Sequence, residues 1–175
     1  QHGHIEKVGY DMYCKILKEA VAELGGEETK QQREIKVAID FPAFIPDGYV
    51  TDEEWRMELY SRIASIKSQQ EAAKLFEELK DVYGEPPQSV RNLTATAMVK
   101  NLAREIGASK ATFKRNECSV YFDMAKEITK ETAAAANATG GAVMLSPPRL
   151  TFSGASCQKN LINFLSKCVF AAKNS

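Results

Sequence analysis

Covalent chemistry needs groupings of side chains that this sequence does not supply. A phosphate-binding loop of the GxxxxGKS or GxxxxGKT type, in which backbone amides surround a phosphate, does not occur in the 175 residues. The segment Ser153-Gly154-Ala155-Ser156 lacks the second glycine of a serine nucleophile elbow. A cysteine nucleophile needs a histidine partner, and the only histidines, His2 and His4, stand at the start of the sequence. We therefore expect neither catalytic residues nor a bound cofactor in this chain.

The cysteines do not form a metal-binding pattern. The sequence has four of them, none in a CxxC pair and none accompanied by histidines at the spacing of a zinc site. We expect reduced, mostly buried thiols in a cytosolic protein, because cysteine often packs as a small core residue. These residues are Cys14, Cys118, Cys157 and Cys168.

Acidic side chains gather in one stretch of a chain that is otherwise balanced in charge. The sequence has 23 basic and 23 acidic residues, which argues against a dedicated nucleic-acid-binding protein. Residues 47–85 nevertheless contain ten acids and five bases. A solvated acidic face would explain such a run. A docking surface for a basic partner would explain it equally well, since complementary charge sets specificity and encounter rate.

Glu78 and Asp81 are the strongest candidates within this acidic stretch. Their spacing of three residues puts both side chains on one face of a predicted helix, near its C-terminal end. Negative charge at that end opposes the helix dipole, so helix stability does not account for it. We predict a protein-interaction surface made of this pair and three neighbours, Lys74, Glu77 and Glu85.

The first 33 residues are predicted to form a helical arm and a linker. Apolar residues recur at steps of three and four through residues 5–24, which indicates one amphipathic helix that ends at Gly25-Gly26. Residues 27–33 are polar. The sequence starts without methionine or a signal peptide, so we expect an excised fragment. No apolar run approaches the roughly 20 residues that a membrane span requires.

The remaining residues divide into predicted helices and short strands. Capping boxes beginning at Thr51 and Ser68 start two helices, whose buried sides we expect to include Trp55 and Val82. Further helices are predicted at residues 88–106, 124–138 and 156–172. Short strands are predicted at residues 34–39, 111–114, 118–122, 142–145 and 149–152.

This order of elements predicts an α+β fold without a βαβ repeat. We expect a small mixed or antiparallel sheet with several packed helices, preceded by the N-terminal amphipathic helix. The expected boundary separates an arm and linker at residues 1–33 from a compact domain at residues 34–175.

Several blocks of sequence resemble the C-terminal region of bacterial transcription-repair coupling factors. The blocks are residues 1–21, the segment Ala43–Val50 with Glu58–Ala64, and the segment Glu77–Gly84 followed by Pro86-Pro87. The similarity covers about residues 1–107 and is weak beyond residue 111, although residues 149–152 coincide with a late strand of the family. The turn Glu85-Pro86-Pro87 departs slightly from the family's usual composition.

The resemblance implies a role in a much larger protein. In this family the intact protein is an ATP-driven DNA translocase that displaces stalled RNA polymerase and recruits nucleotide excision repair through UvrA. Residues 1–33 would be a helical arm and linker from the end of the motor, and ATP and magnesium would bind elsewhere in that motor. Residues 34–175 would be the regulatory domain. By the same resemblance, that domain would fold against the N-terminal module and hide its UvrA-binding face, and the family's acidic pair would correspond to Glu78 and Asp81. A cytoplasmic protein without a membrane partner is implied.

A second interpretation of the sequence rests on its basic C-terminal end. The final 30 residues contain four basic residues and no acid, which would suit an accessory domain that contacts nucleic acid through the last helix. A small hydrolase, the third class considered, would need a perturbed acid or nucleophile that the sequence does not offer. The four basic residues are Arg149, Lys159, Lys167 and Lys173.

Overall fold

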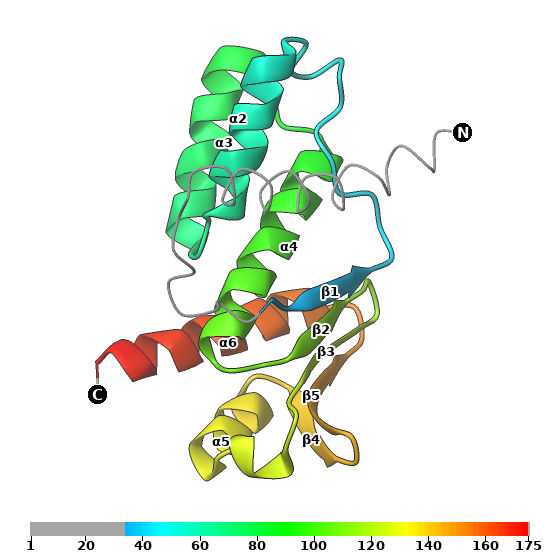
Figure 1. The fold of residues 1–175 in the computed structure, drawn as a ribbon, viewed down its shortest axis with the longest axis vertical. Helices are drawn as coiled ribbons and strands as arrows, with labels where there is room; N and C mark the ends of the chain where they lie inside the picture. The colour runs from blue at the N-terminus through cyan, green and yellow to red at the C-terminus, as the bar shows by residue number, and fades with distance from the viewer. Residues whose placement is uncertain (1–33, 175) are drawn as a thin grey trace. The chain divides into compact units, whose positions relative to one another are not determined.

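The computed structural model describes residues 34–174, which divide into two compact units (Figure 1). Pro42–Met98 belong to the first unit, and residues 34–41 and 99–174 to the second. Helix α4 (Gln88–Glu105) begins in the first unit and ends in the second. The predicted N-terminal arm lies outside the described residues, so the boundary at residue 33 stays a prediction.

The first unit is helical. Helices α2 (Glu53–Ala64) and α3 (Gln69–Tyr83) are joined by residues 65–68 and run antiparallel, side by side (Figure 1). Each helix buries apolar residues at steps of three and four, the spacing that places side chains on one face. The buried residues are Leu59, Tyr60 and Ile63 in α2 and Ala72, Leu75 and Leu79 in α3.

The start of each helix is fixed by a side-chain cap. The Asp52 carboxylate accepts a hydrogen bond from the Trp55 amide at 3.0 Å, so the predicted cap at Thr51 is wrong by one residue. An aspartate cap also complements the positive end of the helix dipole. The predicted cap of α3 is confirmed, because Ser68 Oγ accepts from the Glu71 amide at 3.1 Å. The Glu71 carboxylate accepts in return from the amide of the residue before Ser68, at 2.8 Å.

A buried tyrosine connects α2 to the loop that precedes it. The Tyr60 hydroxyl accepts a hydrogen bond from the Ile45 amide at 3.0 Å, within the core of the first unit. Burial raises the pKa of Tyr60 above its usual value. The contact supplies a partner for a backbone N–H that has lost access to water. The proline-containing loop is therefore an ordered part of this unit.

The second unit contains a five-stranded sheet in the order β1-β2-β3-β5-β4. Strand β1 pairs in parallel with β2, and the other neighbours are antiparallel. Every second side chain is buried along two of the strands, as a strand with one face on the core requires. These buried residues are Ala111 and Phe113 in β2 and Leu150 and Phe152 in β5. The strands are β1 (Lys36–Ile39), β2 (Lys110–Phe113), β3 (Glu117–Tyr121), β4 (Gly141–Leu145) and β5 (Pro148–Ser153).

Helices cover this sheet. Helix α6 (Cys157–Lys173) packs on β3 and β5, and the rings of Phe152 and Phe164 lie 5.5 Å apart between their centroids. Helix α5 (Lys130–Ala138) contacts β4 and α6. A short 3-10 helix, η1 (Ala125–Glu127), precedes α5, so the helix predicted over residues 124–138 is interrupted. The predicted α+β fold with a mixed sheet and packed helices is confirmed.

We predict that Tyr60→Phe destabilises the protein more than Tyr49→Phe does. The first change leaves the buried Ile45 amide without the hydroxyl that accepts from it, at a cost of about 1–3 kcal/mol in the free energy of unfolding. The second removes an exposed hydrogen bond, from Tyr49 to the Gly84 carbonyl at 2.8 Å. Urea denaturation of the two variants measures the difference, and equal losses would contradict the structural role of Tyr60.

Candidate protein-interaction surface

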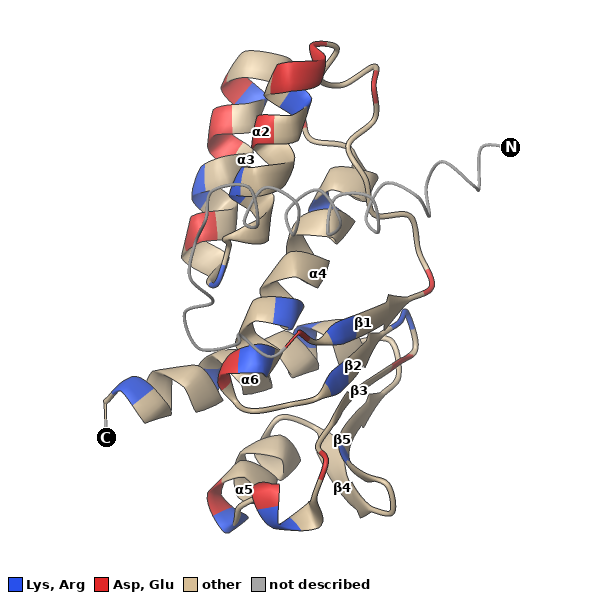
Figure 2. Cartoon of the chain, in the orientation of Figure 1, with Lys and Arg blue, Asp and Glu red and all other residues tan. Residues whose placement is uncertain are grey.

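The outward side of α3 carries four of the five residues of the predicted interaction surface. Lys74, Glu77, Glu78 and Asp81 follow one another at steps of three, one and three residues, and all four are exposed. Glu85 is also exposed, just beyond the end of the helix. Their positions follow from the burial of the opposite side of α3 in the unit's core. Figure 2 shows how densely charged residues cover α2 and α3.

Glu78 is paired within its own unit. Arg62 Nη2 of α2 donates to Glu78 Oε2 of α3 at 2.5 Å, and the two side chains are 50% and 45% exposed. This hydrogen bond and the charge of Arg62 hold the pKa of the Glu78 carboxyl below its usual value. Because the pair is solvated, it can open or share its carboxylate at little cost. Glu78 is thus an ionised carboxylate whose charge is offset by Arg62, and it is still accessible.

Asp81 and Glu77 are the acids of this surface that have no partner within the described part of the chain. Among residues 34–174 neither side chain has a hydrogen bond or an ion pair, and both are exposed. Their negative charge therefore remains available to a positively charged partner. Of the two residues singled out by sequence, Glu78 is paired with Arg62, whereas Asp81 has no ion pair among residues 34–174.

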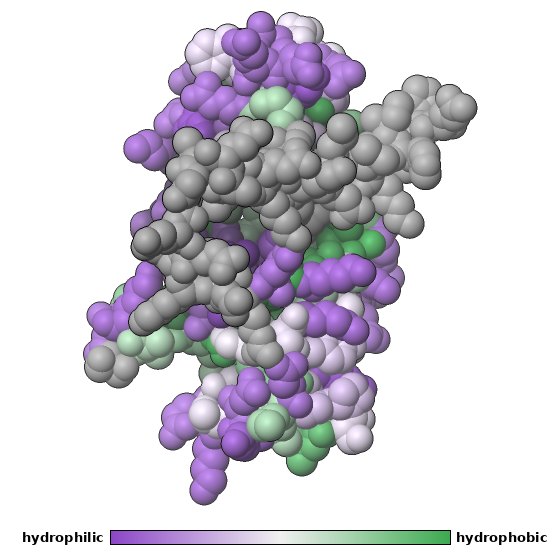
Figure 3. Space-filling model, viewed as in Figure 1, coloured by the Kyte–Doolittle hydropathy of each residue, from purple (hydrophilic) through white to green (hydrophobic). Residues whose placement is uncertain are grey.

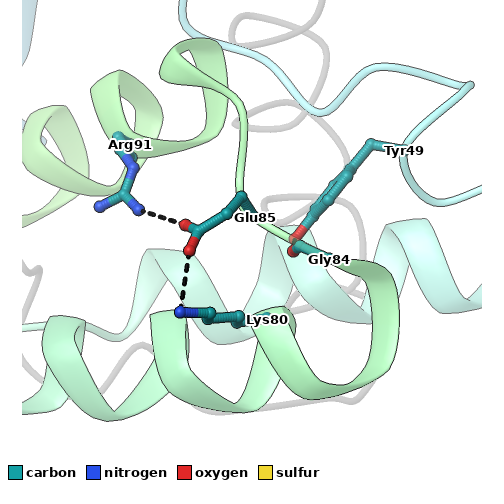
Figure 4. Close-up of polar contacts among 5 residues, drawn as sticks. All are labelled: Tyr49, Lys80, Gly84, Glu85 and Arg91. Carbon is teal, nitrogen blue, oxygen red and sulfur yellow. Dashed lines mark hydrogen bonds and ion pairs between the residues drawn. The ribbon is translucent and has the colours of Figure 1, made fainter.

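Glu85 has a structural role in the turn between α3 and α4. Its two carboxylate oxygens accept from Lys80 at 3.0 Å and from Arg91 at 3.2 Å (Figure 4). The hydrogen bond from Lys80 is the main reason that the pKa of Glu85 lies below its usual value. On the other side of the turn, the Tyr49 hydroxyl donates to the Gly84 carbonyl. These contacts tie the end of α3 to the start of α4.

Two residues predicted to be buried are instead on the surface. Trp55 is 59% exposed and Val82 is 71% exposed. Trp55 lies in the first turn of α2, one turn before the buried face begins at Leu59. Val82 lies in the last turn of α3, beyond Leu79, the last residue of the helix that the core buries. Helical spacing sets the direction in which a side chain points, but the core reaches neither the start of α2 nor the end of α3.

Sequence reasoning also missed Arg62. The partner of Glu78 lies 16 residues away on another helix, so spacing within one helix could not reveal it. Lys74, which the sequence did place on this surface, lies four residues before Glu78 on the same helix, and its charge adds a smaller lowering of the pKa of Glu78.

The cysteines of the second unit do not add a reactive site to this surface. The Sγ atoms of Cys118 and Cys157 are 3.4 Å apart and both residues are buried, whereas Cys168 is half-buried. Burial raises the pKa of the Cys118 thiol, which disfavours the reactive thiolate. Within residues 34–174, no three His, Cys, Asp or Glu side chains are grouped as metal ligands. Across the same residues, no helix has the length and hydrophobicity that a bilayer crossing requires.

Comparison with known families decides where the chain belongs. A family model described as the TRCF domain matches residues 39–133, more than half of the sequence. The chain belongs to the TRCF domain family. The matched segment contains α2, α3 and the whole candidate surface.

Members of the TRCF family from several bacteria are similar in sequence. The transcription-repair-coupling factor of Myxococcus xanthus is 40% identical over 106 residues, covering 61% of this chain and 9% of that protein. The Bacillus subtilis protein is 35% identical over 106 residues, covering 60% and 9%. The Borreliella burgdorferi protein is 28% identical over 131 residues, covering 75% and 12%. The chain thus spans about a tenth of the length of the curated relatives it matches.

A solved structure has the same fold as this TRCF-family chain. The crystal structure of the C-terminal domain of a transcription-repair coupling factor matches with a TM-score of 0.66 at 20% sequence identity. The match covers 81% of this chain and 96% of that one. At this level of identity, the likeness concerns the fold.

We predict that Arg62→Gln raises the pKa of Glu78 toward the usual value for glutamate. The change removes the charged donor that stabilises the carboxylate. In the native protein the pair stabilises the fold above the unfolded-state pKa, and that contribution disappears as the pH falls through the lowered folded-state pKa. NMR titration of the Glu78 side chain in both proteins measures the shift. An unchanged pKa would show that the two side chains are not paired in solution.

Proposed function

We propose that this chain is the C-terminal regulatory domain of a transcription-repair coupling factor and acts by binding another part of the same protein. The observation that carries the proposal is the exposed acidic face of α3, where Asp81 and Glu77 have no partner among residues 34–174. Such a face suits a positively charged protein surface, because complementary charge favours encounter and specificity. Membership of the TRCF family supplies the larger protein in which this contact takes place.

The proposed partner is the N-terminal module that binds UvrA. With the acidic face docked on it, the domain would mask the UvrA-binding face and restrain the motor until RNA polymerase is engaged. ATP hydrolysis and DNA translocation would belong to the motor elsewhere in the protein, with ATP and magnesium as its ligands. This chain would contribute the restraint and no catalytic group, in a protein that acts in the cytoplasm.

A solvated charged interface suits such a restraint. An exposed ion pair contributes about 0–1 kcal/mol, so a few of them hold two surfaces together without making the closed state irreversible. A domain shifts the balance between closed and open forms only by its difference in affinity for the two. A difference of about 2–3 kcal/mol changes the closed-to-open ratio by about 30-fold to 150-fold, which is sufficient for a switch.

We predict that Glu78→Lys plus Asp81→Lys, made in the full-length protein, releases the restraint. Replacing attraction by repulsion at two exposed positions should raise UvrA binding and the basal ATPase rate by about fivefold to 30-fold. Pull-down with UvrA and a steady-state ATPase assay without RNA polymerase measure the two effects.

The matched control makes the same change in charge away from α3. Glu117→Lys plus Glu131→Lys reverses two exposed acids of the second unit. This control should behave as the unmodified protein does. Unchanged UvrA binding and ATPase activity in the Glu78 and Asp81 variant would remove the proposed role of the acidic pair.

The exposed lysines of α6 are the observation behind a second candidate function, contact with nucleic acid. Lys159, Lys167 and Lys173 are all exposed on this helix. We predict that the isolated chain does not bind duplex DNA tightly at low salt, because it has no net positive charge. A fluorescence anisotropy titration at two salt concentrations measures binding. Tight binding that weakens steeply with salt would favour the nucleic-acid function instead.

A further inference from the structure

The two most exposed of the large apolar side chains on α2 and α3 are those of Trp55 and Val82. Trp55 and Val82 are both more exposed than the Arg62–Glu78 pair that joins the two helices. The buried faces of α2 and α3 are built from other positions. An exposed tryptophan is unusual among surface residues and common at the centres of protein interfaces.

The Arg62–Glu78 ion pair shows that Trp55 and Val82 share one side of the hairpin. Val82 follows Glu78 by four residues and Trp55 precedes Arg62 by seven, and both spacings return to the same face of a helix. Because the helices run antiparallel, both steps lead from the ion pair in the same direction (Figure 1). The displacements along the helices are about 6 Å for Val82 and about 10 Å for Trp55. One partner segment can therefore contact both residues.

Exposed acidic residues lie close to these two apolar residues in the sequences of α2 and α3. Glu54 and Glu58 of α2 are exposed and have no hydrogen bond or ion pair within residues 34–174. Asp81 adjoins Val82 on α3. The nearby base Arg56 is already engaged, with Asp47 at 3.6 Å and with the Val50 carbonyl at 3.0 Å. Figure 3 accordingly shows mostly hydrophilic atoms over α2 and α3, at the top of the view.

We propose that Trp55 and Val82 form the apolar centre of a docking surface that binds a protein segment with an apolar side chain flanked by lysine or arginine. The indole of Trp55 can accept a cation over its face, and the surrounding carboxylates favour the same charge. Nucleic acid does not fit, because its phosphates would meet these carboxylates. This inference rests on the proposed function, since it extends the α3 docking surface onto α2 and specifies the chemistry of the partner.

The apolar part of the surface is tested by Trp55→Ala and Val82→Ser in the full-length protein. Each variant should raise the apparent affinity for UvrA by about fivefold, the effect of losing an interface side chain of moderate importance. Phe170→Ala is the matched control, since Phe170 is a 70% exposed aromatic residue on a helix of the second unit. The unfolding midpoint of the isolated chain should be the same for all three variants, because each residue is exposed.

The charged part of the surface is tested by Glu58→Lys, with Glu131→Lys as its control. Glu58→Lys should release the restraint, and Glu58→Gln should do so to a smaller extent, because only the first change adds repulsion. Glu131 is an exposed acid on α5 of the second unit, so its reversal should leave UvrA binding unchanged.

The outcomes separate this inference from the proposed function. Stronger UvrA binding by the Trp55, Val82 and Glu58 variants, with unchanged binding by the control variants, supports the extended surface. If these variants match the unmodified protein while Glu78→Lys plus Asp81→Lys releases the restraint, the extension is wrong and the proposed function stands. If the acidic double variant is silent as well, both fail. An equal effect of Phe170→Ala would also overturn the inference, because it would show no preference for the α2–α3 surface.

Discussion

The orientation of α3 depends on burying one of its sides in the core of the first unit. Ala72, Leu75 and Leu79 face inward, and with a period of 3.6 residues the acids between them face water. Turning α3 to hide its charges would expose the apolar residues that hold it in place. The charged surface is thus a consequence of the same helix packing that stabilises the unit, and it is held in a defined orientation.

Further contacts keep that orientation fixed along the helix. At its start Ser68 caps α3, in its middle Arg62 reaches Glu78 from α2, and at its end Glu85 bridges Lys80 and Arg91. Each exposed ion pair is weak alone, but together they restrict the positions that the charged side chains adopt. A surface ordered before binding loses less conformational entropy when a partner arrives. Pairing within the unit therefore orders the surface while lowering its net charge.

Local patterns in the sequence predicted much of this arrangement. The helical spacing of apolar residues located α2, α3 and the exposed acids, and the alternation of apolar and polar residues located most strands. Both patterns depend only on residues that are neighbours in the sequence. The Arg62–Glu78 pair could not be predicted, since it depends on the register between two helices. The exposure of Trp55 and Val82 was missed for a related reason: spacing gives direction, whereas burial depends on how far the core extends. The division into two units likewise follows from contacts between distant segments.

The central claim is that the α2–α3 surface is covered in the intact, resting protein. Carbodiimide labelling of carboxylates, read by mass spectrometry, measures this coverage directly. The account predicts slower labelling of Glu58, Glu77 and Asp81 in the intact protein than in the isolated chain, with Glu131 labelled equally in both. Equal rates for all four residues in the two proteins would show that nothing covers the surface, and would contradict the account.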